Sequence, residues 1–232
     1  GIVTEVKIKL ADAQRWDQLI VRSQDLDALF AWTVELSQNE AILMRTMCFL
    51  ETPQASYCKP FARYFQDGDH ITLIEVAAKD TETLMQSAEA NGFAVPVRIA
   101  AHFPRKAPMI SDFVQGHTML WAKKADKKLA SCAVKMTTTD WRSQRRQLLS
   151  RFRDNPFFMS VDFHRWQGEI VLQSAFRYVY DTDEGLQERL DFVDSLGLTL
   201  FNTHEPQIES KFHKHQIERK SALKLEHDPK GI

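Results

Sequence analysis

Basic side chains interleaved with aromatic rings are the feature of this sequence that most directly suggests chemistry. Residues 100–154 carry 12 basic and 4 acidic side chains, although the whole chain has a formal net charge of −1. Cations neutralise phosphates and exposed aromatic rings stack on bases, so this combination suits single-stranded nucleic acid. We therefore predict an anion-binding surface in the 102–153 segment, made of ten cations: Arg105, Lys106, Lys123, Lys124, Lys127, Lys128, Arg142, Arg145, Arg146 and Arg153.

Four arginines of this set belong to a predicted helix that begins near a capping residue, Thr139 or Asp140, and ends before Pro156. At about 100° per residue, Trp141 and Leu148 share an apolar seam, and the arginines border it. As binding groups, the guanidinium ions would flank a groove and bind phosphates or carboxylates. In the structural alternative, their stems cover the core edge and their heads pair with the protein's own acids. The binding hypothesis requires the exposed arginines and the lysines to share one surface.

Three histidines, His204, His213 and His215, form a second candidate site. Imidazole nitrogens suit zinc or a similar ion. The spacing of His213 and His215 places both rings on one face of a strand but not of a helix. A metal-dependent hydrolase or nuclease that uses these histidines is therefore an alternative hypothesis.

Other catalytic signatures are missing from the sequence. It contains no GxSxG elbow and no glycine-rich phosphate loop of the GxGxxG or GxxxxGK[ST] type. The cysteines are far apart and form no CxxC pair, which favours a reducing compartment. Cys48 and Cys132 lie in apolar runs and are expected in the core, whereas Cys58 lies among polar and aromatic residues and is expected to be exposed. We expect no cofactor and favour a protein that is not an enzyme.

Length and composition indicate a soluble globular protein. The chain has 232 residues, of which 44% are hydrophobic and 26% charged, both ordinary values. No apolar run approaches the roughly 20 residues of a membrane helix. We therefore expect a cytoplasmic protein that does not enter a membrane.

The elements that must position these residues follow from hydrophobic periodicity and from turn and cap residues. A lysine-rich turn at 123–128 is expected to join the strands of one hairpin, and Gln167-Gly168 those of another. The predicted strands cover residues 3–10, 41–50, 70–78, 93–103, 157–164, 169–180 and 198–201, with a hairpin over 118–136. The predicted helices cover residues 12–22, 25–38, 80–91, 141–153 and 183–196.

This order predicts an α+β fold with ferredoxin-like β-α-β elements, antiparallel hairpins and helices packed on one face, in two similar lobes. We place an N-terminal lobe at residues 1–104 and a C-terminal lobe, with the basic helix and the hairpins, at 105–204. Residues 205–232 form a polar tail, which we expect to lie against the body or a partner subunit.

The expected function is that of an intracellular binding or regulatory protein with an anionic partner, RNA or DNA first. A protein-interaction adaptor or assembly subunit is the further alternative. In that case the cations meet an acidic protein, and the tail supports an oligomer.

Overall fold

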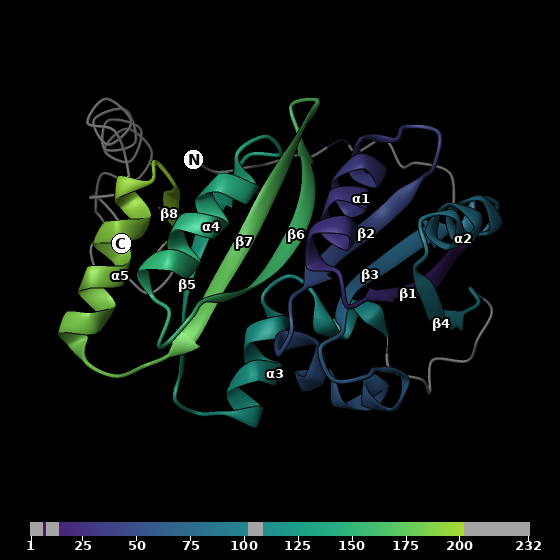
Figure 1. Ribbon diagram of the computed structural model, residues 1–232. Helices are drawn as coiled ribbons and strands as arrows, with labels where there is room; N and C mark the ends of the chain where they lie inside the picture. Colours follow the sequence, from purple (N-terminus) through teal and green to yellow (C-terminus); the bar gives the residue numbers. More distant parts are fainter. Residues whose placement is uncertain (1–6, 8–13, 102–108, 202–232) are drawn as a thin grey trace, which may run out of the picture. The chain divides into compact units, whose positions relative to one another are not determined.

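The computed structural model describes residue 7 and residues 14–101 and 109–201 (Figure 1). Contacts divide the chain into two units, residues 14–201 and residues 1–13 with 202–232. The first unit carries every helix and strand given below and is described by itself. The strand predicted over residues 3–10, the loop at 102–108 and the tail at 205–232 lie outside the described residues, apart from Lys7.

An eight-stranded sheet forms the centre of this unit. Its spatial order is β4-β1-β3-β2-β6-β7-β5-β8, and each neighbouring pair is antiparallel. The strands are β1 (Trp16–Ser23), β2 (Met44–Leu50), β3 (His70–Ala77), β4 (Ala94–Ile99), β5 (Leu129–Met136), β6 (Phe158–Trp166), β7 (Glu169–Val179) and β8 (Thr199–Phe201).

Each half of the sheet has the same topology. Repeat 1 runs β1, α1 (Leu26–Gln38), β2, β3, α2 (Thr81–Ala90) and β4. Repeat 2 runs β5, α4 (Trp141–Arg151), β6, β7, α5 (Asp183–Ser195) and β8. In both, the fourth strand lies beside the first, then the third, then the second, which is the ferredoxin-like order with split β-α-β units. The predicted α+β fold class is thus confirmed, and the predicted division into lobes at residues 104 and 204 stays a prediction.

The repeats join through their second strands. β2 and β6 pair so that Cys48 lies opposite Asp162 and Leu50 opposite Ser160. Above this junction, the ring centroids of Phe30 in α1 and Trp141 in α4 are 4.2 Å apart. The eight strands therefore form one continuous sheet.

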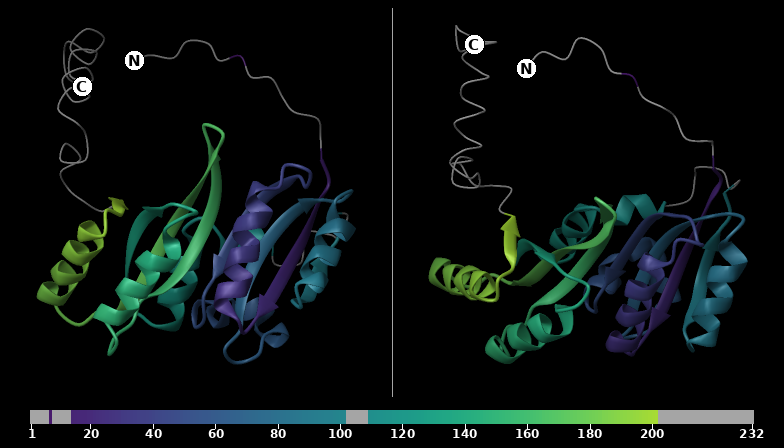
Figure 2. Two further views of the ribbon diagram at one scale, coloured as in Figure 1. Left: turned by 45° about the horizontal axis from the view of Figure 1, so that its top comes forward. Right: turned by 90° about the horizontal axis from the view of Figure 1, so that it is seen from above.

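One face of the sheet carries the four helices of the repeats, as the right view of Figure 2 shows. A single apolar cluster joins Phe30 of α1, Leu84 of α2, Leu148 of α4 and Val193 of α5 to the strands beneath them. Asp25 caps α1, because its side chain accepts a hydrogen bond from the Ala28 amide at 2.9 Å.

The opposite face is covered by short elements. In repeat 1 these are the 3₁₀ helices η1 (Gln54–Tyr57), η2 (Lys59–Tyr64) and η3 (Ile110–Phe113), which enclose a second apolar cluster. In repeat 2 it is α3 (His117–Ala125), which contributes Ala122 to a small cluster with Leu129 and Phe158. Figure 2 shows α3 on the side of the sheet away from α4.

Two predicted elements are wrong. Residues 12–22 were expected to form a helix, but β1 begins at Trp16, because Asp17–Val21 are all buried within a central strand and the helical spacing of their apolar residues is a coincidence. The hairpin over 118–136 is a helix followed by a strand, α3 and β5. Thr118 and Ala122 are the buried residues of α3, at helical spacing, and the chain turns at Asp126.

Cys58 was expected to be exposed and is buried beneath the 3₁₀ helices, whereas Cys48 and Cys132 are buried as expected. The helices beginning near residues 25, 80, 141 and 183 and the hairpin turning at Gln167-Gly168 are confirmed.

Candidate anion-binding surface on helix α3

Helix α3 is held against the sheet by few apolar contacts. Its Thr118 and Ala122 are buried. The Trp121 ring stacks on Phe113 of η3 with centroids 4.9 Å apart, and its indole N–H donates to the Asp112 carbonyl oxygen at 3.0 Å. Trp121 is thereby fixed at the edge of the protein with part of its ring uncovered.

A hollow of about 640 Å³ opens beside this ring. The Lys124 ammonium lies 4.6 Å from the Trp121 ring centroid, within range of a cation–π interaction. Leu120 projects next to it with 61% of its surface exposed. The residues that line the hollow are Asp112, His117, Leu120, Trp121, Lys123, Lys124 and Lys127, and we call this set the α3 surface.

Lysines dominate the charge of the α3 surface. Lys123, Lys124 and Lys127 are exposed, as is the neighbouring Lys128. Within the part of the chain that the structure describes, none of the four forms an ion pair with a carboxylate. Asp112 is the acidic residue among the lining side chains. The surface therefore presents uncompensated positive charge beside an aromatic ring.

The arginines of α4 lie on the other face of the sheet. Trp141 and Leu148 of α4 pack in the cluster that contains Met159, whereas α3 packs on Phe158, the preceding residue of β6. Successive strand residues point to opposite faces. The structure thus brings the lysines together but does not bring the α4 arginines to them, so the prediction that these cations share one surface is wrong.

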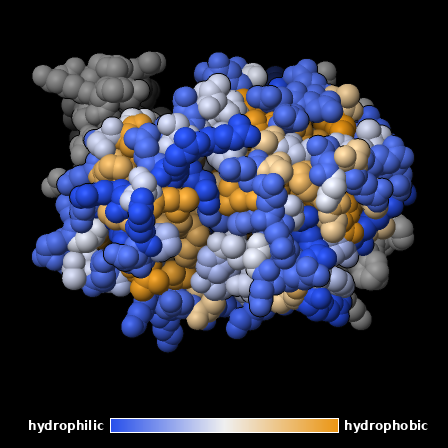
Figure 3. Space-filling model, in the orientation of Figure 1, coloured by the Kyte–Doolittle hydropathy of each residue, from blue (hydrophilic) through white to orange (hydrophobic). Residues whose placement is uncertain are grey.

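Individual α4 arginines have different surroundings. The Arg145 guanidinium forms an ion pair with Glu51, whose other carboxylate oxygen accepts from the Met159 amide at 3.1 Å. Arg142 lies over the Trp141 ring, 4.7 Å from its centroid. Arg146 is exposed, as is Arg153 beyond the helix end. Figure 3 shows that hydrophilic side chains predominate on the face that carries α1, α4 and α5, with apolar patches among them.

The remaining predicted site residues lie outside the described residues: Arg105, Lys106, His204, His213 and His215. Among the residues that are described, no group of three or more histidine, cysteine or acidic side chains could hold a metal ion. The metal hypothesis for the histidines stays a prediction.

A buried charged residue, Arg177 of β7, was missed by the sequence reasoning. It is fully buried, and its Nη1 donates to Ser160 Oγ at 2.8 Å and to the Ala175 carbonyl oxygen at 3.3 Å. Its Nη2 donates to Thr118 Oγ1 of α3 at 2.7 Å. Burial lowers the pKa of this guanidinium to about 10. The sequence did hold a signal for this residue. Arg177 lies inside a predicted strand between Phe176 and Tyr178, whose side chains point to the opposite face of the sheet.

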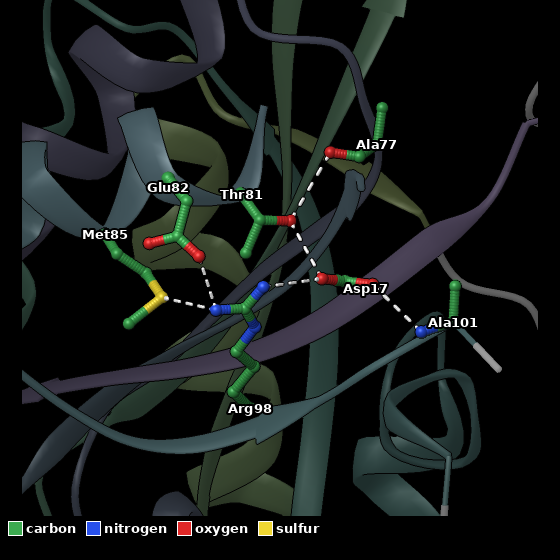
Figure 4. A network of polar contacts seen from close by, with 7 residues as sticks. All are labelled: Asp17, Ala77, Thr81, Glu82, Met85, Arg98 and Ala101. Atoms are coloured by element: carbon green, nitrogen blue, oxygen red, sulfur yellow. Dashed lines mark hydrogen bonds and ion pairs between the residues drawn. The ribbon is translucent and has the colours of Figure 1, made fainter. Parts of the chain in front are cut away.

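In repeat 1, by contrast with Arg177, a buried charged side chain has both hydrogen-bond partners and an opposite charge (Figure 4). The buried Asp17 carboxylate accepts from Thr81 Oγ1 at 3.1 Å, from the Ala101 amide at 2.9 Å and from Arg98 at 3.4 Å. Arg98 also donates to Glu82 at 2.6 Å. This network ties β1, α2 and β4 together, and we assign it a structural role.

No helix of the described chain combines the length and the apolar character needed to cross a membrane. The sequence matches no known protein family, and no curated protein matches it either.

Solved structures do share the fold. Two crystal forms of alkyldihydroxyacetonephosphate synthase, P1 and P212121, match with TM-scores of 0.58 and 0.59, each at 11% identity and over 93% of this chain. The chain spans 43% and 44% of the synthase chain in those two crystal forms. A structure titled as a putative glycine cleavage system transcriptional repressor matches with a TM-score of 0.25 and 10% identity, over 80% of this chain and 95% of its own. At such identities, the likeness to the synthase shows the fold alone.

Proposed function

We propose that this chain is a non-enzymatic binding protein that engages an anionic partner, single-stranded RNA or DNA first, through the α3 surface. The observation that carries the proposal is the hollow bordered by Lys123, Lys124 and Lys127, whose wall includes the ring of Trp121. Among the described residues these lysines have no carboxylate partner, so their charge is available to a ligand.

The chemistry of this surface fits a flexible polyanion better than a rigid one. The Trp121 ring is stacked on Phe113 and carries the Lys124 ammonium over it, so a base that displaces the Lys124 side chain could stack on the ring, which contributes about 1–3 kcal/mol per base. Lysine ammonium groups on mobile stems act as point charges that follow a backbone of variable path. Leu120, exposed beside Trp121, extends the apolar contact for a second base.

The experiment is a salt titration of fluorescent single-stranded RNA and DNA against the wild type and two matched variants. Binding through Z phosphates makes log K fall with log salt concentration with a slope of about −0.7Z, so three lysines predict a slope near −2. Substituting Lys123, Lys124 and Lys127 together by alanine should abolish most of that slope. The Arg142→Ala/Arg146→Ala variant changes cations on the opposite face and should leave it unchanged.

Each alternative result has a definite meaning. If only the arginine variant loses the slope, the binding surface is on α4 and the α3 proposal is wrong. If neither nucleic acid binds at low salt, the chain does not bind nucleic acid through these cations.

The second candidate function is that of one lobe in a larger protein or assembly. In alkyldihydroxyacetonephosphate synthase, the part that matches this chain makes up less than half of the synthase chain. In that case the exposed Leu120 and its neighbouring lysines would meet an acidic protein surface instead of a nucleic acid.

A photo-crosslinking side chain at position 120 separates the two candidates. After irradiation in cells, the leading proposal expects an adduct that nuclease removes. The second candidate expects an adduct that resists nuclease and is removed only by protease. A variant with the same group at the exposed Glu35 on the other face is the control for random capture.

A further inference from the structure

Arg177 carries a buried positive charge without a counter-charge in contact. A guanidinium has five N–H donors, and three hydrogen bonds engage them, all to hydroxyl or carbonyl oxygens. Its Nε is buried and has no hydrogen-bond partner. No carboxylate of the described residues lies within 4.0 Å of the group. Buried charges are ordinarily paired, because removing an ion from water costs several kcal/mol.

Asp162 interacts electrostatically with Arg177 but lies beyond ion-pair distance of it. Burial raises the pKa of Asp162, which accepts from the Gln115 amide at 3.2 Å and interacts with the Cys48 thiol. Burial also raises the pKa of Cys48 well above its usual value. At neutral pH Arg177 is charged, since its lowered pKa of about 10 is still above 7.

The first turn of α3 adds to the positive electrostatic potential near the Arg177 guanidinium. Gly116 precedes the helix without a side-chain cap, and Arg177 is hydrogen-bonded to Thr118 in that first turn. Helix N-termini carry partial positive charge and favour anions. Gln54 donates to the Thr118 carbonyl oxygen at 2.9 Å, and its own Oε1 is buried without a partner. Of the two unpaired buried atoms beside Thr118, Arg177 Nε is a donor that an oxyanion can use, whereas Gln54 Oε1 is an acceptor that cannot bind one.

The cover over Arg177 is lightly built. Apart from Thr118, α3 buries only Ala122, which packs in a cluster with Leu129 and Phe158. Opening α3 breaks the Trp121–Phe113 stacking and the hydrogen bonds of Trp121 and Gln54, but it leaves the main core on the other face intact, so local opening is expected below the free energy of global unfolding. Opening would expose the Nε–Nη2 edge of the guanidinium, a fork that matches two oxygens of one oxyanion.

We propose that Arg177, with the hydroxyls of Thr118 and Ser160, is an internal site for one oxyanion, a phosphate or a carboxylate group, admitted by movement of α3. The bound group supplies the missing negative charge and accepts from the free donors of Arg177. The site is on the inner side of α3 and does not depend on the lysines of the outer side. It would remain if the nucleic-acid proposal failed.

The test measures thermal unfolding of the full chain in inorganic phosphate, in acetate and in chloride at matched ionic strength. A ligand at a hundredfold its Kd that binds only the folded state should raise Tm by roughly 5 °C or more for a chain of this size. We expect that rise in phosphate or acetate but not in chloride, and the more effective anion identifies the class of ligand.

Three variants assign the effect to Arg177. Arg177→Met keeps much of the side-chain volume, removes the charge and should lose the anion-dependent rise. Arg177→Lys keeps the charge without the fork and should weaken the apparent affinity at least about tenfold, which tests the site even if the methionine variant does not fold. The Lys123→Ala/Lys124→Ala/Lys127→Ala variant should retain the full rise. Equal shifts in chloride, or an undiminished rise in the Arg177 variants, would overturn the proposal.

Discussion

The two repeats share one topology and one helix-covered face, but they differ on the other face. In repeat 1 that face carries large apolar side chains, among them Ile20, Leu50 and Leu73, sealed by three 3₁₀ helices. In repeat 2 it carries Ser160 and Arg177 beneath the single helix α3. Repeat 1 therefore has a large apolar core on each side of its sheet, whereas the α3 side of repeat 2 has only the small cluster of Ala122, Leu129 and Phe158.

Connection length explains much of this difference. Residues 51–69 join the second and third strands of repeat 1, and this segment forms η1 and η2. The same connection in repeat 2 is Gln167 and Gly168, both at positive φ, which forms a tight hairpin turn and covers nothing. In a fold built from two repeats, one repeat can thus bury apolar side chains on a sheet face, while the other repeat keeps polar side chains on the same face.

The largest expected effect tests the sealed face. Leu73→Ala removes a fully buried side chain beneath the 3₁₀ helices and should lower the free energy of unfolding by about 2–5 kcal/mol. Ser131→Ala, at a half-buried site opposite Arg177 in repeat 2, should change it by less than about 0.5 kcal/mol. Urea unfolding of both variants measures the contrast, and equal losses would contradict the assignment of stability to repeat 1.

The next effect tests the junction between the repeats. Arg145→Ala removes the ion-pair partner of Glu51, and it leaves a buried carboxylate at the β2–β6 boundary. We expect a loss of about 2 kcal/mol at pH 7, below the range for completely buried pairs because Arg145 is partly exposed. Arg142→Ala and Arg146→Ala, on the same helix, should change stability by less than about 0.5 kcal/mol.

The loss in Arg145→Ala should depend on pH. Burial already raises the pKa of Glu51, against the opposing effect of Arg145, and removing Arg145 raises it further. A carboxyl whose pKa is raised on folding contributes stability that is present below its unfolded pKa, near 4.3, and is lost as pH rises through the folded value. The difference between variant and wild type should therefore shrink from pH 7 to pH 4. A constant difference would mean that the pair stabilises by packing and not by charge.

Local patterns predicted most of the fold because its elements obey local rules. The α1 helix has Asp25 as its cap, and the β6–β7 hairpin turns at Gln167-Gly168. The predictions were wrong where burial in the folded protein differs from what the local periodicity of apolar residues indicates. In β1, residues on both sides of the strand are buried, so no alternation distinguishes it from a helix. The α3 lysines were predicted to form a hairpin turn, because α3 has only two buried residues and therefore shows little helical periodicity.

The candidate site was predicted only in part, for a physical reason. Charge clustering along the chain indicated the lysines of the α3 surface, which are neighbours because Lys123 and Lys124 end the helix and Lys127 follows just after it. It also grouped them with the arginines of α4, and no local pattern shows that the intervening strand β5 places the two helices on opposite faces. Arg177 was missed because its surroundings, Thr118 and Ser160, come from distant segments.

The smallest effect concerns the longer connection of repeat 1. His70 begins β3, and its Nδ1 accepts a hydrogen bond from the Thr52 amide at 3.1 Å. This bond ties the first turn of the covering segment to the sheet and requires a neutral ring. Burial lowers the pKa of His70, and the charge of Arg145 lowers it further.

The sign of the pH dependence follows from that direction. A base whose pKa is lowered on folding contributes stability that is complete above its unfolded pKa, near 6.5, and is lost as pH falls through the folded value. His70→Asn keeps an acceptor for the Thr52 amide but cannot be protonated. Between pH 7 and pH 5 the wild type should therefore lose slightly more stability than the variant, and the 3₁₀ segment should be where hydrogen exchange accelerates. If the two pH profiles are parallel, or if hydrogen exchange accelerates only in repeat 2, His70 does not hold the 3₁₀ segment against the sheet of repeat 1.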